Sequence, residues 1–312
     1  VGIIVYGVIL IMNADLTMGA LIACVILSGR TLAPLGQITN LIGRFNQALV
    51  AYTNLEELFS TKSRELKSKE NLRHKSLESS VNLKNVTVVY PGVEKPSLES
   101  INISINSGEK VAILGKIGSG KTTLLRAISG LIHLKSGSVQ IGQIELTHLH
   151  PDDLRQAVSI CLQQPLLFSG TIKDNILLGE PNATDDVIVK YAKITGVDQI
   201  ASKLPDGYAT NVNERGDILS GGQRQAVTIA RTLIGEPEIL VFDEPTSSMD
   251  TQTENLIIQN LKKWAGKKTL IVATHRGQLL ELVDRVIVLE SGRIVADGSK
   301  EEILKASKRA NS

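Results

Sequence analysis

A glycine-rich string at residues 115–122 constrains the fold of this chain more than any other feature. It reads Gly-Lys-Ile-Gly-Ser-Gly-Lys-Thr and fits the phosphate-loop pattern G-x-x-x-x-G-K-[ST]. An apolar run at 110–114 precedes it, and apolar residues with helical spacing at 122–131 follow it. This order of strand, loop and helix lets the helix N-terminus direct free N–H groups at phosphate oxygens. The sequence therefore predicts an α/β domain with a phosphate site at the end of one strand.

The pattern predicts a role for each residue of the loop. Lys121 is expected to reach the β- and γ-phosphates of a nucleotide, and the Thr122 hydroxyl to ligate Mg²⁺. Lys116 occupies a variable position and is expected to be solvated. The first glycine of the pattern and four further donors to phosphate oxygens complete the predicted nucleotide site: Gly115, Gly118, Ser119, Gly120 and Thr123.

A second string, Leu-Ser-Gly-Gly-Gln at 219–223, lies about a hundred residues downstream. By chance it is expected roughly once in several thousand chains of this length. With both strings in this order, the chain resembles the ATP-binding cassette (ABC) transporters, whose signature is LSGGQ. The resemblance implies an α/β P-loop NTPase fold with an antiparallel β subdomain and a helical subdomain between about 166 and 236. Alternating apolar residues at 81–90 and 98–105 predict strands with one exposed face.

Another apolar run, at 239–244, ends in two carboxylates, Asp243 and Glu244. We expect this strand to lie beside the phosphate-loop strand in a parallel sheet, where ligands gather at the carboxyl ends of strands. Asp243 resembles the Walker-B aspartate that holds Mg²⁺. Glu244 is then placed to orient or deprotonate the attacking water, a contribution of about 10²–10⁴ in rate.

Four further positions match the ABC family. Tyr90, at a strand end, matches the aromatic residue that stacks on adenine, with core packing as the alternative. His275 ends an apolar strand and matches the switch histidine. Gln163 matches the Q-loop glutamine, a Mg²⁺ contact that reports γ-phosphate occupancy to the membrane helices, and Gln164 is the neighbouring alternative. Asp250 matches the D-loop aspartate.

The signature also predicts a second copy of the chain. It opens a helix expected at 222–233, whose N-terminal N–H groups form another anion site. In the family, the signature of one protomer contacts the γ-phosphate bound by the opposite protomer. The resemblance therefore implies a homodimer with ATP and Mg²⁺ at its interface, in which four residues act in trans: Ser220, Gly221, Gly222 and Gln223.

The N-terminal residues are apolar and almost uncharged at 1–12 and 18–29. A spanning helix needs about 20 apolar residues, and the first run falls short because the chain begins inside it. Thr17 is expected to cap the second helix. The pair resembles the last membrane helices of an ABC exporter, with 41–60 as a cytosolic extension. A buried hairpin of soluble helices is the alternative.

These features predict three regions. Residues 1–60 are expected to be the C-terminal part of a transmembrane domain in contact with lipid, 61–80 a charged linker, and 81–312 the ATP-binding domain. The basic linker favours the cytosolic side by the positive-inside rule. The resemblance implies a C-terminal fragment of a multi-pass protein of the bacterial inner membrane, with its ATPase domain in the cytoplasm. A soluble ABC ATPase without transport is the alternative from another class.

Two positions keep two interpretations each. Arg30 either lines an export path or extends its charge to the cytosolic boundary of the membrane. The string at 213–216 resembles the X-loop of exporters, which contacts the membrane helices and favours export over import, and a solvated turn is the alternative. The two cysteines, Cys24 and Cys161, lack metal-ligand or disulfide spacing, so core packing is expected for both.

The substrate is predicted by resemblance. The strings at 16–23, 28–35 and 292–298 look like those of bacterial type I secretion transporters, which export RTX-type proteins or adhesins. This implies a polypeptide substrate, a periplasmic adaptor and an outer-membrane channel, with lipid or drug export as the alternative. The net charge of +2 and the absence of a basic stripe interleaved with aromatic residues exclude nucleic acid as an expected partner.

Overall fold

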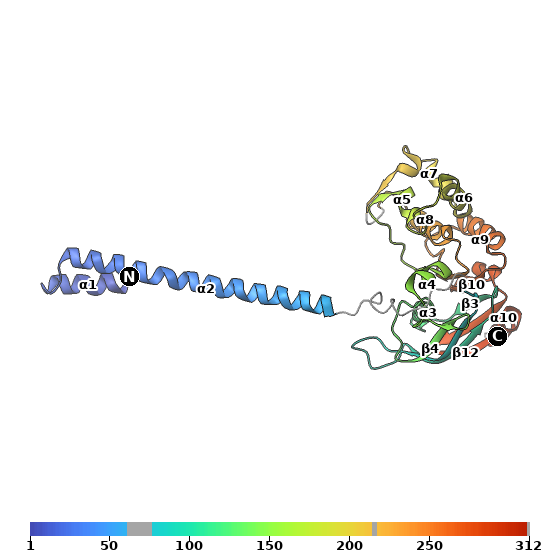
Figure 1. The fold of residues 1–312 in the computed structure, drawn as a ribbon, viewed down its shortest axis with the longest axis horizontal. Coiled ribbons are helices and arrows are strands. Elements are labelled where there is room, and N and C mark those ends of the chain that lie inside the picture. The colour runs from blue at the N-terminus through green and yellow to red at the C-terminus, as the bar shows by residue number, and fades with distance from the viewer. Residues whose placement is uncertain (61–76, 214–216, 311–312) are drawn as a thin grey trace. The chain divides into compact units, whose positions relative to one another are not determined.

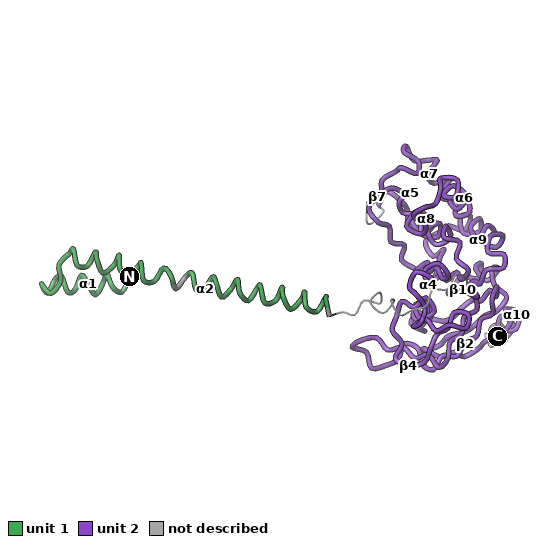
Figure 2. Tube along the Cα trace, viewed as in Figure 1, with its two compact units in different colours: residues 1–66 green, residues 67–312 purple. Residues whose placement is uncertain are grey.

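The computed structural model describes residues 1–60, 77–213 and 217–310. The chain divides into two compact units, Val1–Leu66 and Lys67–Ser312 (Figure 2). This boundary falls inside the linker predicted at 61–80, of which 61–76 lie outside the described residues. Ser79, near the end of that linker, packs into the second unit, since its carbonyl accepts a hydrogen bond from the Thr269 hydroxyl at 2.7 Å.

The first unit is a helical hairpin (Figure 1). Helix α1 (Gly2–Met12) folds back along the start of helix α2 (Met18–Ser60). Thr17 caps α2 as predicted, because its Oγ1 accepts a hydrogen bond from the Ala20 N–H at 3.3 Å. Gly7 allows the close approach of the two helices, because a Cβ at this position would collide with the Leu21 side chain.

Helix α2 continues through Pro34 and exposes most of its large apolar side chains. Among the residues of this unit whose burial is described, only Gly7 and Leu21 are buried. The hairpin therefore does not bury its own apolar surface. Cys24 is exposed, so its predicted core packing is wrong for this unit: it lies on a helix face that α1 does not cover. Of the described helices, one, Met18–Phe59, is long and apolar enough to cross a membrane, judged by length and composition.

The second unit is built on a six-stranded sheet with the order β12-β11-β3-β10-β9-β6. Five strands are parallel, and β12 at one edge is antiparallel to β11. The strands are β3 (Lys110–Leu114), β6 (Val158–Cys161), β9 (Ile239–Asp243), β10 (Thr269–Ala273), β11 (Arg285–Glu290) and β12 (Arg293–Ser299).

Apolar residues cover both faces of this sheet. Leu240 and Phe242 join one buried cluster, whereas Ile239 and Val241 join the other. Helix α3 (Lys121–Ile128) packs into the second cluster, and helices α8 (Gly221–Ile234) and α9 (Thr251–Ala265) pack into the first. Continuous apolar strands such as β9 are therefore needed, because neither face meets water. Cys161 is buried in β6, as predicted, and burial raises the pKa of its thiol to about 12.

The expected strand order was wrong in one respect. Strand β10 pairs with both β3 and β9 and separates them, so the acidic strand does not adjoin the phosphate-loop strand. All five residues of β10 are buried, which favours a central position with neighbours on both edges. The placement matters because β10 leads directly to His275.

The antiparallel subdomain is a four-stranded sheet with the order β2-β1-β4-β5. Its strands are β1 (Val81–Val88), β2 (Leu98–Ile105), β4 (Ser136–Ile141) and β5 (Ile144–Glu145). The alternating burial of β2 confirms the predicted exposed and buried faces. The buried side chains of β1 and β2 belong to the same cluster as α3, so this sheet covers the phosphate-loop region.

The helical subdomain lies within the predicted range of about 166–236 and groups α5 to α8 together (Figure 1). It contains α5 (Ile172–Leu177), α6 (Asp185–Thr195), α7 (Val197–Ala201), α8, the short 3₁₀ helix Gly207–Ala209 and the strand pair β7 (Gly170–Thr171) and β8 (Asn211–Val212). The remaining elements are α4 (Pro151–Ala157), the 3₁₀ helix Gly277–Leu282 and α10 (Lys300–Ala310).

Candidate nucleotide and hydrolysis site

The phosphate loop connects β3 to α3 as predicted, and two of its glycines are required for different reasons. Gly118 has φ +80° with nothing near the position of a Cβ, so only its backbone conformation excludes other residues. Gly120 has φ +104°, and a Cβ there would also lie 2.6 Å from the Ser97 carbonyl oxygen. The loop is thus held against the start of β2.

Lys121 and Thr122, the first residues of α3, point to different partners. The Lys121 ammonium donates to the carbonyl oxygens of Gly115 at 2.7 Å and Lys116 at 3.2 Å, so it lies across the loop. The Thr122 hydroxyl donates to Asp243 Oδ2 at 2.6 Å. The fold therefore joins two predicted Mg²⁺ ligands that are 121 residues apart in the chain.

Asp243 is 1% exposed, and this burial raises the pKa of its carboxyl group, although the Thr122 hydroxyl opposes the shift. A carboxylate and a hydroxyl in contact suit Mg²⁺, which takes one or two protein oxygens and fills its octahedron with water and phosphate oxygens. The donor set therefore fits this ion. Among the described residues, no group of three or more His, Cys, Asp or Glu side chains is arranged to hold a metal ion.

Glu244 and His275 meet because β9 and β10 are paired in parallel. His275 Nδ1 lies 2.7 Å from Glu244 Oε1, and the Thr274 hydroxyl donates to Oε2 at 3.4 Å. Glu244 is 5% exposed and has φ +48°, a conformation that is costly for a residue with a side chain. Its N–H donates to the Ala273 carbonyl at 2.9 Å, which holds it there.

Tyr90 lies next to the phosphate-loop helix. Its hydroxyl is 3.3 Å from Thr123 Oγ1, and its side chain is half-buried. The fold thus places the only aromatic residue predicted for this site beside it, whereas stacking on adenine stays a prediction. Gln163 and Gln164 are both exposed and follow β6. Because Cys161 pairs with Phe242, both glutamines lie at the carboxyl edge of the sheet, and the choice between them stays open.

The signature opens α8 at Gly221, one residue earlier than predicted. Ser220 is the N-cap, and its Oγ accepts a hydrogen bond from Gln223 N–H at 3.2 Å. Gln223 Oε1 accepts from Ser220 N–H at 2.8 Å, which completes a capping box. Gly222 must be small because a Cβ there would lie 2.9 Å from the Ser248 carbonyl oxygen. The signature therefore packs against the turn that leads to Asp250.

Asp250 is the N-cap of α9. Its Oδ1 accepts from the N–H groups of Gln252 and Thr253 at 3.0 Å, and its Oδ2 accepts from the Thr253 hydroxyl at 2.7 Å. These hydrogen bonds lower the pKa of the carboxyl group. Asp250, Ser220, Gly222 and Gln223 all line a pocket of about 240 Å³ that includes none of the phosphate-loop residues 115–123. The predicted site residues thus form two groups in one chain.

Gln225 was missed by the sequence reasoning. It is 1% exposed, and its Nε2 donates to Ser247 Oγ at 2.8 Å and to the Glu244 carbonyl at 3.4 Å. Its Oε1 accepts from the Ser248 N–H at 2.9 Å. The side-chain amide therefore ties the signature helix to the turn after β9. Its position, a polar residue on the largely apolar buried face of α8, could have indicated that the side chain binds other buried polar groups.

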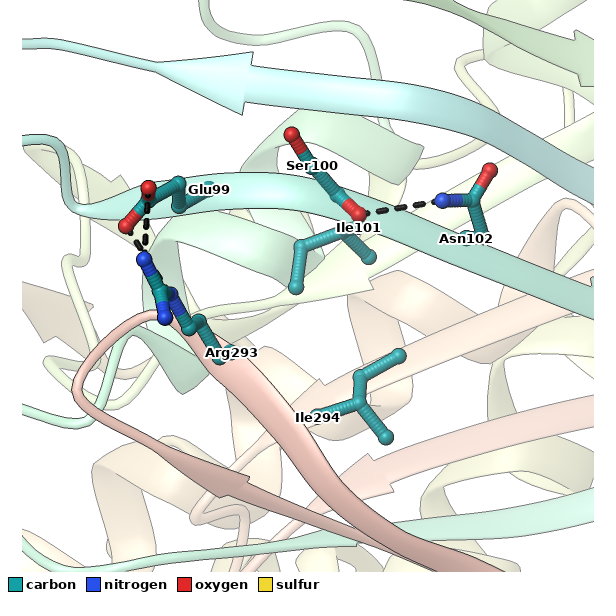
Figure 3. Close-up of a pocket in the computed structure, with 6 residues that line it drawn as sticks. All are labelled: Glu99, Ser100, Ile101, Asn102, Arg293 and Ile294. Carbon is teal, nitrogen blue, oxygen red and sulfur yellow. Dashed lines mark hydrogen bonds and ion pairs between the residues drawn. The ribbon is translucent and has the colours of Figure 1, made fainter.

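A separate surface pocket of about 420 Å³ lies between β2 and β12 (Figure 3). Its polar groups bind one another: Arg293 donates to both oxygens of Glu99 at 3.0 and 2.7 Å, and Asn102 donates to the Ser100 carbonyl at 3.0 Å. It contains no predicted site residue. The neighbouring turn supports the phosphate loop, because the Gly292 N–H donates to the Ser119 carbonyl at 2.9 Å.

The X-loop predicted at 213–216 lies mostly outside the described residues, since 214–216 are not described. On its described flanks, Asn213 Oδ1 accepts a hydrogen bond from the Asp217 N–H at 3.1 Å. This contact does not distinguish an exporter loop from a solvated turn.

Comparison with known proteins agrees with the geometry. Residues 98–247 match the family described as ABC transporter. The chain is 35% identical over 302 residues to the uncharacterized ABC transporter ATP-binding protein YknV of Bacillus subtilis, covering 96% of this chain and 49% of that protein. It is also 35% identical over 301 residues to the leukotoxin translocation ATP-binding protein LktB of Mannheimia glucosida, covering 96% and 42%.

A solved structure is also similar: a bacterial Atm1-family ABC exporter with ATP bound has a TM-score of 0.74 at 30% identity, covering 94% of this chain and 51% of that one. The chain thus spans about half the length of the relatives it matches. The fold and the site define a P-loop ATP-binding protein. More specifically, residues 98–247 belong to the ABC transporter family, and the chain as a whole resembles ABC exporters.

Proposed function

We propose that this chain hydrolyses ATP to drive export across a membrane. The observation that carries the proposal is the convergence of four polar side chains at the carboxyl edge of the sheet. Thr122 contacts Asp243, and Glu244 contacts His275, at the ends of strands that are distant in sequence. Ligands of parallel sheets bind at this edge.

Binding of the triphosphate is assigned to the start of α3. Lys121 leaves the carbonyl oxygens of the loop and turns its ammonium to the β- and γ-phosphates, while the loop N–H groups donate to phosphate oxygens. Thr122 and Asp243 are the residues that would hold Mg²⁺, with Gln163 as a third ligand from the edge of the sheet. Mg²⁺, when bound there, would supply positive charge that neutralises the charge developing on the phosphates. Tyr90 would stack on the adenine.

Glu244 is the proposed general base. Its carboxylate accepts a proton from the attacking water or orients that water toward the γ-phosphorus. His275 holds Oε1 of this carboxylate and keeps its second ring nitrogen for the γ-phosphate. The positive φ of Glu244 is consistent with a residue held in a strained conformation for this purpose.

A second copy of the chain would complete the site. The signature residues Ser220, Gly221, Gly222 and Gln223 open α8, and all of them except Gly221 line a pocket that includes no phosphate-loop residue of the same chain. The N-terminus of α8 is therefore available to a γ-phosphate bound by the partner's Lys121, and Asp250 lies in the same pocket. The proposed assembly is a homodimer that closes on ATP and opens after hydrolysis.

The substitution Glu244→Gln tests the catalytic assignment. We expect turnover to fall about 10²-fold or more while ATP affinity stays nearly unchanged, because the amide keeps the shape of the side chain but cannot accept the proton. The ATPase rate and the nucleotide affinity are both measured for the variant and for the parental chain. Parental turnover in this variant would remove Glu244 as the base and return Asp243 or His275 to consideration.

We further infer that the exported substrate is a polypeptide. The support for this substrate is the similarity to a leukotoxin translocation protein. The support for a membrane location is α2, a 43-residue helix whose apolar side chains are largely exposed. The proposed location is the bacterial inner membrane with the ATPase unit in the cytoplasm. A periplasmic adaptor and an outer-membrane channel would complete the route. Neither a soluble ATPase nor a buried hairpin explains so much exposed apolar helix surface.

The secretion proposal is tested by deleting the gene and, separately, by introducing Glu244→Gln. We expect a large secreted protein to be lost from the culture supernatant and retained in the cells in both strains. Unchanged secretion combined with altered lipid content or drug sensitivity would assign the chain to lipid or drug export instead. Unchanged secretion, lipids and drug sensitivity would favour an ATPase without transport.

A further inference from the structure

An ion pair between a buried carboxylate and a half-buried guanidinium lies beside the proposed catalytic groups and takes no part in the steps above. Glu254, in the first turn of α9, is 2% exposed. Its Oε2 accepts a hydrogen bond from Arg276 Nη1 at 2.8 Å, and its Oε1 accepts from the Thr246 hydroxyl at 2.6 Å. Thr246 is fully buried. Both carboxylate oxygens are therefore satisfied by donors from two other segments of the chain.

Arg276 directly follows His275 and joins both segments that carry the proposed catalytic groups. Its Nη2 donates to the Ser247 carbonyl at 2.9 Å, which fixes the turn after β9. Its backbone N–H donates to Thr274 Oγ1 at 2.9 Å. That hydroxyl in turn donates to Glu244 Oε2 at 3.4 Å. A chain of hydrogen bonds thus runs from the Arg276 backbone N–H through the Thr274 hydroxyl to the carboxylate of the proposed base, while the guanidinium holds the turn after β9.

The chemistry of this pair suits it to holding segments of the chain in place more than to raising the free energy of unfolding. Such a pair adds little to the free energy of unfolding compared with apolar residues of the same volume, because the carboxylate loses its hydration and the guanidinium loses part of it. A guanidinium, however, offers several donors in a rigid plane and can hold two acceptors at a fixed separation. Here those acceptors, Glu254 Oε2 and the Ser247 carbonyl, come from α9 and from the turn that precedes it.

We propose that Arg276 and Glu254 are positioning residues for ATP hydrolysis. They hold the turn after Glu244 against the segment that carries His275, so that the two side chains keep their 2.7 Å contact. This inference rests on the roles proposed above for Glu244 and His275. Neither Arg276 nor Glu254 is required to touch nucleotide, so their effect is on turnover and not on binding.

The first test is Arg276→Met in the native chain. We expect kcat to fall about 10-fold with KM and nucleotide affinity changed by about twofold or less, the pattern of a group that acts after binding. The thermal midpoint also falls, because Glu254 becomes a buried charge without its cation. A parental kcat in this variant would overturn the proposal.

A double variant separates placement from stability. Arg276→Met combined with Glu254→Gln removes both charges, so the thermal midpoint recovers toward the parental value. If the pair positions the catalytic groups, kcat stays about 10-fold low, because the link through Arg276 between α9 and the Ser247 carbonyl is gone. Recovery of kcat together with the midpoint means that the pair is only structural, and the proposal is wrong.

Two further variants complete the design. Arg276→Lys keeps the charge but one ammonium cannot reproduce the planar fork, so the midpoint recovers more than kcat does. Arg285→Met is the matched control: Arg285 is similarly buried and binds Asp297 and Glu109 away from the site. It is expected to lower the midpoint and leave kcat unchanged. Equal losses of kcat in both arginine variants would show a general effect of destabilisation and overturn the proposal.

Glu244→Gln is measured in parallel to distinguish the two levels of inference. If Glu244→Gln keeps its turnover, the proposed catalytic assignment fails whatever Arg276 does. If Glu244→Gln is slow while Arg276→Met and the double variant keep the parental kcat, the catalytic assignment stands and the positioning role alone is lost.

Discussion

Helices α3 and α8 both begin at a glycine-rich string, yet their N-termini are capped differently. Gly120, the N-cap of α3, has no side chain and leaves the first N–H groups of the helix free of a cap. Ser220, the N-cap of α8, closes a capping box with Gln223. The start of α3 therefore suits a ligand that supplies all of its acceptors, such as a chain of phosphates.

The start of α8 offers fewer free donors, because the capping box already satisfies the Gln223 N–H. Ser220 Oγ accepts from Gln223 N–H, so its own O–H stays available as a donor. The helix dipole adds a partial positive charge at the same point. Such a surface suits an anion that is already held elsewhere. The comparison thus supports one complete phosphate site per chain and one donor surface offered to a second copy.

Mixed dimers test most directly whether α8 of one chain serves the phosphate site of the other, and they should give the largest effect on turnover. Lys121→Ala on one chain and Ser220→Ala on the other should concentrate both lesions in one site and leave the other intact. Turnover at the damaged site should fall about 10²-fold or more. Nucleotide trapping at each site is the measurement.

The matched control places both lesions on one chain and pairs it with a parental chain. In the trans arrangement each site then carries one lesion, and both are impaired. If this control retains an intact site while the first mixed dimer has none, the signature acts within its own chain and the proposed assembly is wrong.

Alanine substitutions at two glycines, one at each helix start, test the same difference through stability. Gly120→Ala should destabilise the domain by about 1–3 kcal/mol or more, because it combines a left-handed φ with a Cβ 2.6 Å from a backbone oxygen. Gly221→Ala should cost much less, since a Cβ there would lie 3.2 Å from the Ser248 Cβ and no positive φ is needed. Chemical denaturation compares the two. Equal losses in the free energy of unfolding would contradict the inferred difference between these two helix N-termini.

The smallest expected effect concerns two aspartates. Asp243 has a raised pKa in the folded state, so its charge opposes folding: stability rises as pH falls from the folded-state pKa toward the unfolded value. Asp250 has a lowered pKa, so its charge supports folding, and that stability is lost as pH falls through the folded-state pKa. Near neutral pH, Asp243→Asn should raise the thermal midpoint and Asp250→Asn should lower it.

Thermal unfolding from neutral to acid pH is the measurement, with the parental chain as reference. Asp243→Asn should also lose Mg²⁺-dependent hydrolysis, which separates its functional role from its stability cost. A decrease in the midpoint of Asp243→Asn near neutral pH would mean that the buried carboxylate is stabilising, contrary to the direction of its pKa.

The parts of the site that could be predicted are those contained in one local segment. The phosphate loop, the acidic end of β9 and the start of α8 each place functional groups on a single turn, so residue type and spacing define them. The predicted homodimer, the Mg²⁺ ligands and the adenine contact follow from the same motifs and stay predictions. Cys24 shows the limit of this reasoning, because an apolar sequence does not say what covers it.

The sequence by itself determined the phosphate-loop domain, the two carboxylates and the signature, because each depends on backbone geometry within a few residues. Only the tertiary structure decided that β10 separates β3 from β9, and hence that His275 contacts Glu244. It likewise brought Arg276 to Glu254 and Gln225 to the turn after β9. Strand order and buried polar contacts depend on how both faces of the sheet are covered, and that packing joins residues too distant in the chain for local spacing to specify.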